Sequence, residues 1–406
     1  MTRIGIVIYL ILLLMVKIGV AQESYTFRGS FEDCKKKALH ENKLILVDLY
    51  FEGCVPCKMM DEKVFPSTEV DAELKANFVL YKTDVFKEED GMKLSRKYGV
   101  SGFPTYLIMN PSGKVIYIES GYFAVDRFMD LLHEGKKRSA ENKLLAFDTD
   151  LEKHYPSYFT YRYFRKGDKG EPLDLKNYIK DKNLKEETAF VVSSLVNNND
   201  VDSWTYNNLP WLLDNYGSSL LRKKVIKRMD SKMIAYGKAQ QLDSLNTTLA
   251  YIRPVFNAQL WKTFLPQFIT DYYKGSQDAD LYLSYMDSYQ LYPSWPLRSN
   301  ALAQVIIDQK DNKSVLKKIR QQYLDQEKQG DLDITDRYKL TLLHFYLVDY
   351  VNAAKGVEIL KLLTNNTKER TITPSELNLL SAAITQKKPN IYLPQLAVRT
   401  IGSSFE

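Results

Sequence analysis

A short apolar run that ends in a pair of cysteines constrains this chain most tightly. Leu44–Phe51 is continuous, short and rich in β-forming residues, which is typical of a buried strand. Cys54 and Cys57 follow after a turn, separated by Val55 and Pro56, and open a predicted helix. Unpaired amide groups at a helix N-terminus favour the thiolate of Cys54. Because Cys57 lies one turn further along, the motif indicates dithiol–disulfide exchange.

The length and composition of the chain indicate a globular protein of more than one domain. With 406 residues the chain is too long for one ordinary domain, so two or three are expected. Hydrophobic residues make up 45% of it and charged residues 26%, enough to build a sizeable core. The net charge of +6 is too small to indicate a nucleic-acid partner. The basic cluster at residues 222–228 has apolar residues at helical spacing, which predicts a solvated helix face.

The N-terminus has the features of an export signal. Arg3 precedes an apolar stretch from Ile4 to Val16, and the small residues Gly19 and Ala21 fit signal-peptidase cleavage. Residues 1–21 are therefore predicted to be a signal peptide, with an uncleaved anchor as the alternative. No later segment approaches the roughly 20 apolar residues that a membrane span needs. We expect an exported protein without a transmembrane span in the mature chain, periplasmic in a Gram-negative bacterium.

The remaining metal-binding residue types argue against a zinc site at the cysteine pair. A Cys-x-x-Cys zinc site needs two further ligands. Only Cys34 and four histidines remain, and no second pair has the spacing of metal ligands. No metal and no cofactor are therefore expected. Cys34 shares a predicted helix face with Phe31 and Ala38, which indicates an inert core residue, with a regulatory thiol as the alternative.

Helical and strand patterns alternate through residues 22–138 and end in a hairpin. Besides the first strand, the patterns predict strands at residues 78–83, 105–109 and 114–118, and helices at residues 31–39, 68–77, 88–98 and 125–134. Such an order predicts an α/β domain in which helices flank a mixed sheet.

Three sequence blocks in register resemble the thioredoxin family, over a stretch from about Tyr25 to Lys137. The first is the strand carrying Asp48, six residues before Cys54. The second is the Cys-x-x-Cys motif itself, and the third is the loop at residues 98–105 that contains Pro104. The segments around these blocks are similar to exported thioredoxin-like proteins, including the C-terminal domain of a transmembrane disulfide reductase.

The resemblance implies a role for each residue of the motif. Cys54 is expected to be the more exposed thiol and to attack a substrate disulfide, and Cys57 then resolves the mixed disulfide. Asp48 matches the buried carboxylate of the family, whose burial raises its pKa so that it can relay a proton for Cys57. Lys82 is predicted to be a surface lysine rather than a partner of Asp48.

The same resemblance places a substrate-binding surface around the cysteines. Pro104 matches the cis-proline of the family, whose loop pairs with an extended substrate. Phe103 and Thr105 beside it, and Val55 and Pro56 between the cysteines, are the predicted substrate contacts.

Two departures from the family pattern qualify the expected activity. Gly53 occupies the position of a tryptophan that precedes the first cysteine in cytosolic thioredoxins. Val55 and Pro56 carry no charge, so only the helix terminus and local dipoles favour the thiolate. We therefore expect an exchanger that leans toward reduction and is restricted in its partners.

Residues 139–406 lack cysteines and show mainly helical patterns. Thr373 and Glu376 form a predicted capping box, with Pro374 at the first helical position. A helix starting at Thr335 and another starting at Val357, after the segment 352–356, predict a helical hairpin. No fixed period relates this hairpin to earlier ones, so an irregular all-α domain of helical hairpins is expected.

The sequence thus favours an exported thiol–disulfide oxidoreductase with a helical domain of unassigned function. Its expected partners are protein thiols or disulfides and, because no cytoplasmic reductase is within reach, a membrane electron relay. The alternative is a non-catalytic scaffold that uses the thioredoxin-like domain for docking, which Gly53 and the large helical part favour.

Overall fold

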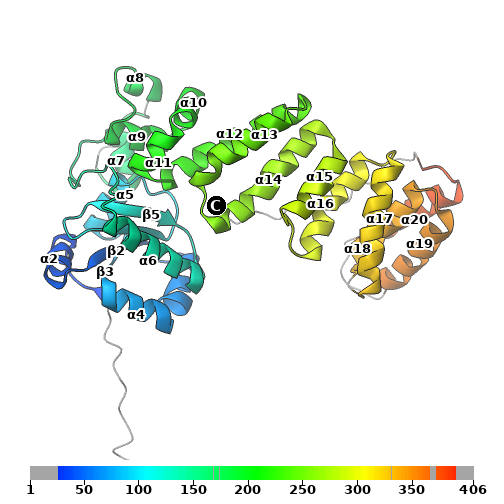
Figure 1. Cartoon of the computed structure of the whole chain (residues 1–406), viewed down its shortest axis with the longest axis horizontal. Coiled ribbons are helices and arrows are strands. Elements are labelled where there is room, and N and C mark those ends of the chain that lie inside the picture. Colours follow the sequence, from blue (N-terminus) through cyan, green and yellow to red (C-terminus); the bar gives the residue numbers. More distant parts are fainter. Residues whose placement is uncertain (1–25, 168, 173, 331, 366–371, 390–406) are drawn as a thin grey trace, which may run out of the picture. The chain divides into compact units, whose positions relative to one another are not determined.

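The computed structural model describes residues 26–167, 169–172, 174–330, 332–365 and 372–389 (Figure 1). The predicted signal peptide at residues 1–21 lies outside these ranges. The chain divides into two compact units: the first runs to Arg228 and includes Tyr251–Phe256, and the second comprises the remaining residues from Met229 onward. The boundary suggested between residues 138 and 139 stays a prediction. Within the described ranges, no helix is both long enough and apolar enough to cross a membrane.

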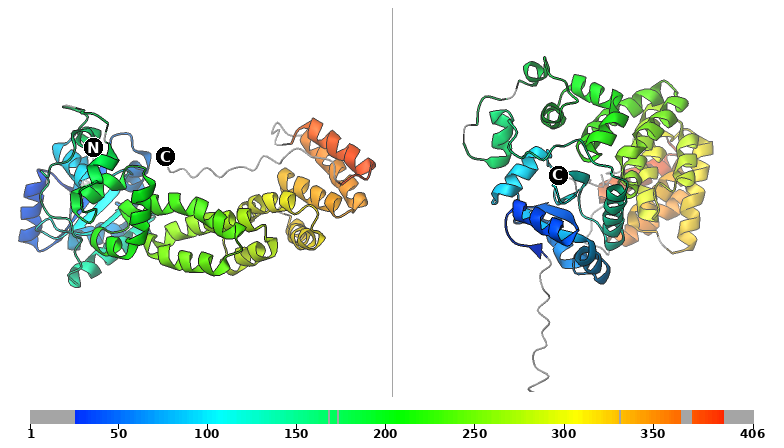
Figure 2. Two further views of the ribbon diagram at one scale, coloured as in Figure 1. Left: turned by 90° about the horizontal axis from the view of Figure 1, so that it is seen from above. Right: turned by 60° about the vertical axis from the view of Figure 1, so that its left-hand side comes forward.

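A five-stranded mixed sheet forms the centre of the first unit (Figure 2). Its strands lie in the order β1-β3-β2-β4-β5, with β1, β3 and β2 parallel and β4 antiparallel to both β2 and β5. This arrangement confirms the predicted α/β fold with a mixed sheet. The strands are β1 (Thr26–Phe27), β2 (Leu44–Tyr50), β3 (Phe78–Asp84), β4 (Thr105–Met109) and β5 (Val115–Ser120).

Helices cover both faces of the sheet because alternate strand residues are apolar on each face. α4 (Thr68–Asn77) and α6 (Val125–Ala140) enclose one core with the inward residues of β2, β3 and β4. On the other face lie α2 (Phe31–Glu41) and α5 (Glu89–Lys97), joined by a hydrogen bond of 2.7 Å from the Phe31 amide to Asp90.

Six helices continue the chain beyond α6, and the first unit includes them as far as Arg228. A cluster of charges around the buried Lys97 ties this segment to α5: its ammonium donates to Asp148 at 2.8 Å and to Glu187 at 2.7 Å. The helices are α7 (Ser157–Phe164), α8 (Leu175–Ile179), α9 (Glu187–Ser194), α10 (Asn199–Asn207), α11 (Leu209–Tyr216) and α12 (Ser219–Lys238).

The basic cluster at residues 222–228 differs from its prediction. Lys224 is only 5% exposed and donates to Asp202 at 2.7 Å. Arg222 forms an ion pair of 2.8 Å with Glu119, which is buried on β5. The prediction of a solvated face was therefore wrong for these two residues, because each finds a buried carboxylate partner far away in the sequence.

The second unit consists of helices in its described ranges, as predicted. The capping box of Thr373 and Glu376 is present at the start of α20. One detail of the predicted hairpin was wrong: α19 already starts at Tyr350, so Gly356 lies inside it. There a Cβ atom would approach Thr341 of α18 to 2.2 Å, so the glycine serves close helix packing. The helices are α13 (Leu242–Ile252), which ends in the first unit, α14 (Ala258–Ser276), α15 (Ala279–Ser288), α16 (Trp295–Asp308), α17 (Lys313–Lys328), α18 (Ile334–Tyr346), α19 (Tyr350–Asn365) and α20 (Pro374–Thr385).

Candidate active site

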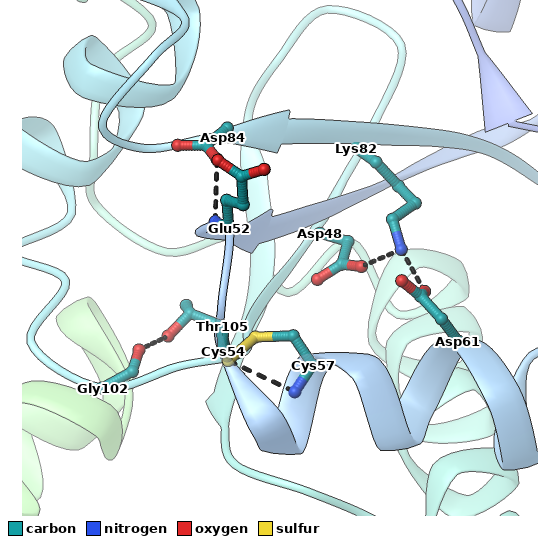
Figure 3. Close-up of a disulfide and its surroundings, with 9 residues drawn as sticks. All are labelled: Asp48, Glu52, Cys54, Cys57, Asp61, Lys82, Asp84, Gly102 and Thr105. Atoms are coloured by element: carbon teal, nitrogen blue, oxygen red, sulfur yellow. Dashed lines mark hydrogen bonds and ion pairs between the residues drawn. A yellow bond between two sulfur atoms is a disulfide. The ribbon is translucent and has the colours of Figure 1, made fainter.

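Cys54 and Cys57 form a disulfide at the start of α3 (Val55–Met59), directly after β2 (Figure 3). Cys54 occupies the N-cap position, and its sulfur accepts a hydrogen bond of 3.2 Å from the Cys57 amide. The chain continues without interruption into a π-helical turn, η1 (Met60–Val64). The Cys57 amide, which donates to the Cys54 sulfur, is the group that would stabilise a thiolate there after reduction.

The exposure of the two cysteines differs from the prediction. Cys54 is 6% and Cys57 is 5% exposed, so in the disulfide form neither is the more accessible residue. Val55 between them is 68% exposed instead. The turn before the helix is tight, since the Cys54 amide donates to the Phe51 carbonyl and Gly53 has a φ of +92°. That backbone conformation favours glycine at this position.

Asp48 lies on β2 and is 1% exposed, as the resemblance implied. Its neighbour on β3 is Lys82, whose ammonium nitrogen lies 3.1 Å from an Asp48 carboxylate oxygen. The same ammonium also donates to Asp61 on η1, as Figure 3 shows. The prediction of a surface lysine was wrong: the parallel register of β2 and β3 places Lys82 directly beside Asp48.

The environment of Asp48 favours its protonated form. Burial raises the pKa of this carboxyl to about 6, although Lys82 opposes the shift and the charge of Asp61 adds to it. Burial alone would lower the pKa of Lys82, but the attraction of its two carboxylate partners raises it, so the ammonium keeps its proton. Among the described residues, the second oxygen of Asp48 has no hydrogen-bond partner. Asp48 can therefore accept and release a proton near neutral pH.

The loop that precedes β4 lies beside the end of β2. Leu49 and Thr105 are opposite each other in the antiparallel register, and the peptide bond between Phe103 and Pro104 is cis. Thr105 is 1% exposed, and its hydroxyl donates to the Gly102 carbonyl at 2.8 Å. The side chain of Thr105 thus holds the loop, whereas Phe103 is half-buried at the surface.

Comparison with known proteins agrees with this geometry. A family model described as a thioredoxin-like domain matches residues 31–136. The chain carries a thioredoxin-like domain. Together with the Cys54–Cys57 disulfide, the domain is of the thiol–disulfide oxidoreductase kind.

The curated relatives match about a quarter of this chain. The thiol:disulfide interchange protein DsbD of Colwellia psychrerythraea is 31% identical over 90 residues, which are 22% of this chain and 15% of the relative. The protein of the same name from Actinobacillus pleuropneumoniae is 26% identical over 102 residues, 25% of this chain and 18% of the relative. The matched segment thus spans less than a fifth of either relative's length.

Two solved structures cover a similar share of the chain. A thioredoxin from Thermus thermophilus has 23% identity and a TM-score of 0.26, covering 28% of this chain and 88% of that one. The oxidised C-terminal domain of Neisseria meningitidis DsbD has 20% identity and a TM-score of 0.23, covering 25% of this chain and 90% of that one.

The sequence did not predict two features of the thioredoxin-like domain: the position of one acidic residue and the contacts among three phenylalanines. Asp61 follows Cys54 by seven residues, and the π-helical turn directs it to Lys82. Phe51 and Phe86 both contact Phe103, with ring centroids 5.2 and 6.2 Å from it. In the sequence, only the presence of an aromatic residue next to each strand end indicated that these phenylalanines could meet.

Cys34 lies in the core beneath α2, as its helix face predicted. It is 0% exposed and has a free thiol, and burial raises its pKa to about 12. A fully buried thiol with a raised pKa is poorly suited to react, in agreement with the predicted inert core residue. The described residues contain no group of three or more His, Cys, Asp or Glu side chains placed to hold a metal ion.

Proposed function

We propose that this protein is an exported thiol–disulfide oxidoreductase that donates electrons from the Cys54–Cys57 dithiol to disulfides of protein substrates. The observation that carries the proposal is the disulfide at a helix N-terminus beside Asp48, a buried carboxyl with a pKa of about 6. Reduction as the direction is supported by Val55 and Pro56, which add no charge that would stabilise the dithiol form.

The exchange runs in two steps that conserve electrons and protons. The Cys54 thiolate attacks one sulfur of the substrate disulfide, forms a mixed disulfide and releases the other substrate sulfur as a thiolate, which takes up a proton. Cys57 then transfers its proton to Asp48 and attacks the Cys54 sulfur. The second substrate thiolate leaves and is protonated from Asp48, so that the substrate gains two electrons and the enzyme ends as the disulfide.

Four residues around the disulfide are the proposed contacts for the substrate. An extended substrate segment would lie along Phe103 and Pro104 and contact Val55 and Pro56, which are exposed between the two cysteines. Regeneration of the dithiol requires a reducing partner outside the cytoplasm, for which a membrane electron relay is the proposed source. Cleavage near Ala21 would leave a mature periplasmic protein that starts at Gln22.

A trapping experiment tests the proposal. Cys57→Ser should accumulate mixed disulfides between Cys54 and substrate proteins in the native compartment, because the resolving thiol is absent. The double variant Cys54→Ser, Cys57→Ser is the matched control and should trap nothing. If the single variant forms no adducts, and the purified wild-type chain does not reduce a test disulfide, the oxidoreductase proposal is wrong and a docking role is favoured.

A further inference from the structure

Three phenylalanines and one arginine form a surface next to the disulfide, here named the aromatic rim: Phe51, Phe86, Phe103 and Arg165. The Phe51 ring lies 5.5 Å from Phe86 and 5.2 Å from Phe103, and all three rings are half-buried. Half-exposed aromatic rings in mutual contact offer a fixed apolar surface that loses little entropy when a partner binds.

The backbone around the rim is held rigidly against the reactive pair. The Phe51 carbonyl accepts the Cys54 amide at 3.1 Å, which holds the backbone of Phe51 against that of Cys54. The Asp84 carboxylate accepts the amides of Phe86 at 2.8 Å and Glu52 at 2.9 Å. Phe103 directly precedes Pro104. The rim thus joins the ends of β2 and β3 to the loop before β4.

Arg165 comes from outside the thioredoxin-like domain, at the C-terminal end of α7. Its guanidinium carbon lies 3.8 Å from the centre of the Phe86 ring. Contacts with Arg96 of α5 hold α7 in place, since that guanidinium lies 4.9 Å from the Phe164 ring and 5.2 Å from the Tyr155 ring. Arg165 is therefore positioned at the rim by the helical segment that follows the domain.

Within the described part of the chain, the charge of Arg165 is unbalanced, unlike those of Lys87 and Lys93. Across the described residues, no carboxylate lies within ion-pair distance of it, whereas Lys87 pairs with Glu52 and Lys93 with Glu89. Stacking on a ring occupies the face of a guanidinium and leaves the N–H groups at its edge available for a carboxylate. Arg165 is exposed, so an incoming chain can reach those groups.

We propose that the aromatic rim recognises polypeptide substrates that carry a carboxylate side chain next to the target cysteine. The inference rests on the proposed function, because it assigns the substrate class of the same disulfide. The rings contact the apolar part of the substrate segment, and Arg165 binds its carboxylate. The helical segment after the domain thereby contributes to substrate selection at the disulfide.

A pair of matched peptides tests the inference on the full-length reduced chain. The two peptides each contain one disulfide and are identical except for Glu or Gln next to the cysteine. The wild-type chain should reduce the Glu peptide about two- to five-fold faster, the range of an exposed ion pair. Arg165→Gln should remove this preference and Arg165→Glu should invert it. Arg162→Gln, on the same helix and also exposed, should keep it.

A neutral small disulfide, 4,4′-dithiodipyridine, separates failure of this inference from failure of the proposed function. If the wild-type chain reduces neither this reagent nor the peptides, the oxidoreductase proposal itself is wrong. If it reduces the reagent but treats both peptides equally, or if Arg162→Gln loses the preference as fully as Arg165→Gln, the rim does not select carboxylates. A preference that decreases with added salt supports the ion pair.

Discussion

Lys82 and Lys97 both lie among carboxylates inside the first unit, yet their surroundings differ in charge balance. Lys82 faces Asp48 and Asp61, so its cluster holds one more negative than positive group, and one Asp48 oxygen has no partner among the described residues. Around Lys97, two lysines meet two carboxylates, with Lys153 bonded to both Asp148 and Glu187.

Burial and charge balance together give the two clusters opposite pKa shifts, and burial is the main cause of the raised pKa of Asp48. Asp48 has a pKa raised to about 6, whereas that of Asp148 is lowered to about 2 because the hydrogen bonds from Lys153 and Lys97 outweigh burial. A balanced cluster with satisfied hydrogen bonds stays charged and serves as a clamp. An excess carboxylate with an unpartnered oxygen can instead exchange a proton near neutral pH.

Among the substitutions that test this comparison, removal of Lys97 should change the free energy of unfolding most. Lys97→Met leaves Glu187 buried without its nearest cation, which should lower the free energy of unfolding by about 3–5 kcal/mol. Hydrogen exchange of the sheet amides in urea, measured on the full chain, reports this loss. Lys93→Met on the same helix is the control, since its pairs are partly exposed and should contribute at most about 1 kcal/mol. A loss of similar size in both variants would contradict the role of a clamp.

Removal of the Asp48 charge should have the opposite effect on stability, because it should increase the free energy of unfolding. The folded-state pKa of about 6 exceeds the ordinary value of 3.8, so protonation favours folding. That stabilisation is complete below the ordinary value and is lost as the pH rises through about 6. Asp48→Asn should therefore raise the free energy of unfolding of the disulfide form at pH ~8 by up to about 3 kcal/mol.

The gain should disappear near pH ~4, where Asp48 is largely protonated in the wild-type chain. The same hydrogen-exchange measurement at both pH values tests this. An equal gain at both would show that packing, and not charge, is responsible. In stopped-flow exchange, Asp48→Asn should also slow the step that depends on Cys57, because the proton acceptor is absent.

Removal of the Asp61 charge should give the smallest effect. Asp61 raises the pKa of Asp48 through its charge, and its side chain is 46% exposed. Asp61→Asn should therefore lower the pKa of Asp48 by less than about one unit, since water screens the interaction. Carbon-13 NMR titration of the Asp48 carboxyl measures the shift. Glu62→Gln, next to it and paired with Lys58, should leave the titration unchanged.

Local patterns predicted the parts of the fold and site that depend on neighbours in the sequence. The strand before Cys54, the helix after it and the capping box at Thr373 all follow from residues a few positions apart. The pairing of Asp48 with Lys82 depends on the register of β2 and β3, whose paired residues are 34 positions apart. No property of either strand alone fixes that register.

Longer separations account for the other residues that the sequence did not assign. Lys97 and Glu187 are 90 positions apart, and Arg165 contacts Phe86 across 79. A lysine or arginine in an amphipathic helix is usually solvated, so each was indistinguishable from a surface residue until the helices were packed. Whether such a lysine or arginine has a structural role is determined by its buried partner and not by the basic residue itself.

Cys34 can serve as a natural probe of how often the native fold opens. In the oxidised form the other two of its three cysteines are joined, so Cys34 is the sole thiol, and it is sealed beneath α2. An alkylating reagent should label it only when that helix separates from the sheet. The rate of labelling thus counts opening events of the native fold without any engineered probe.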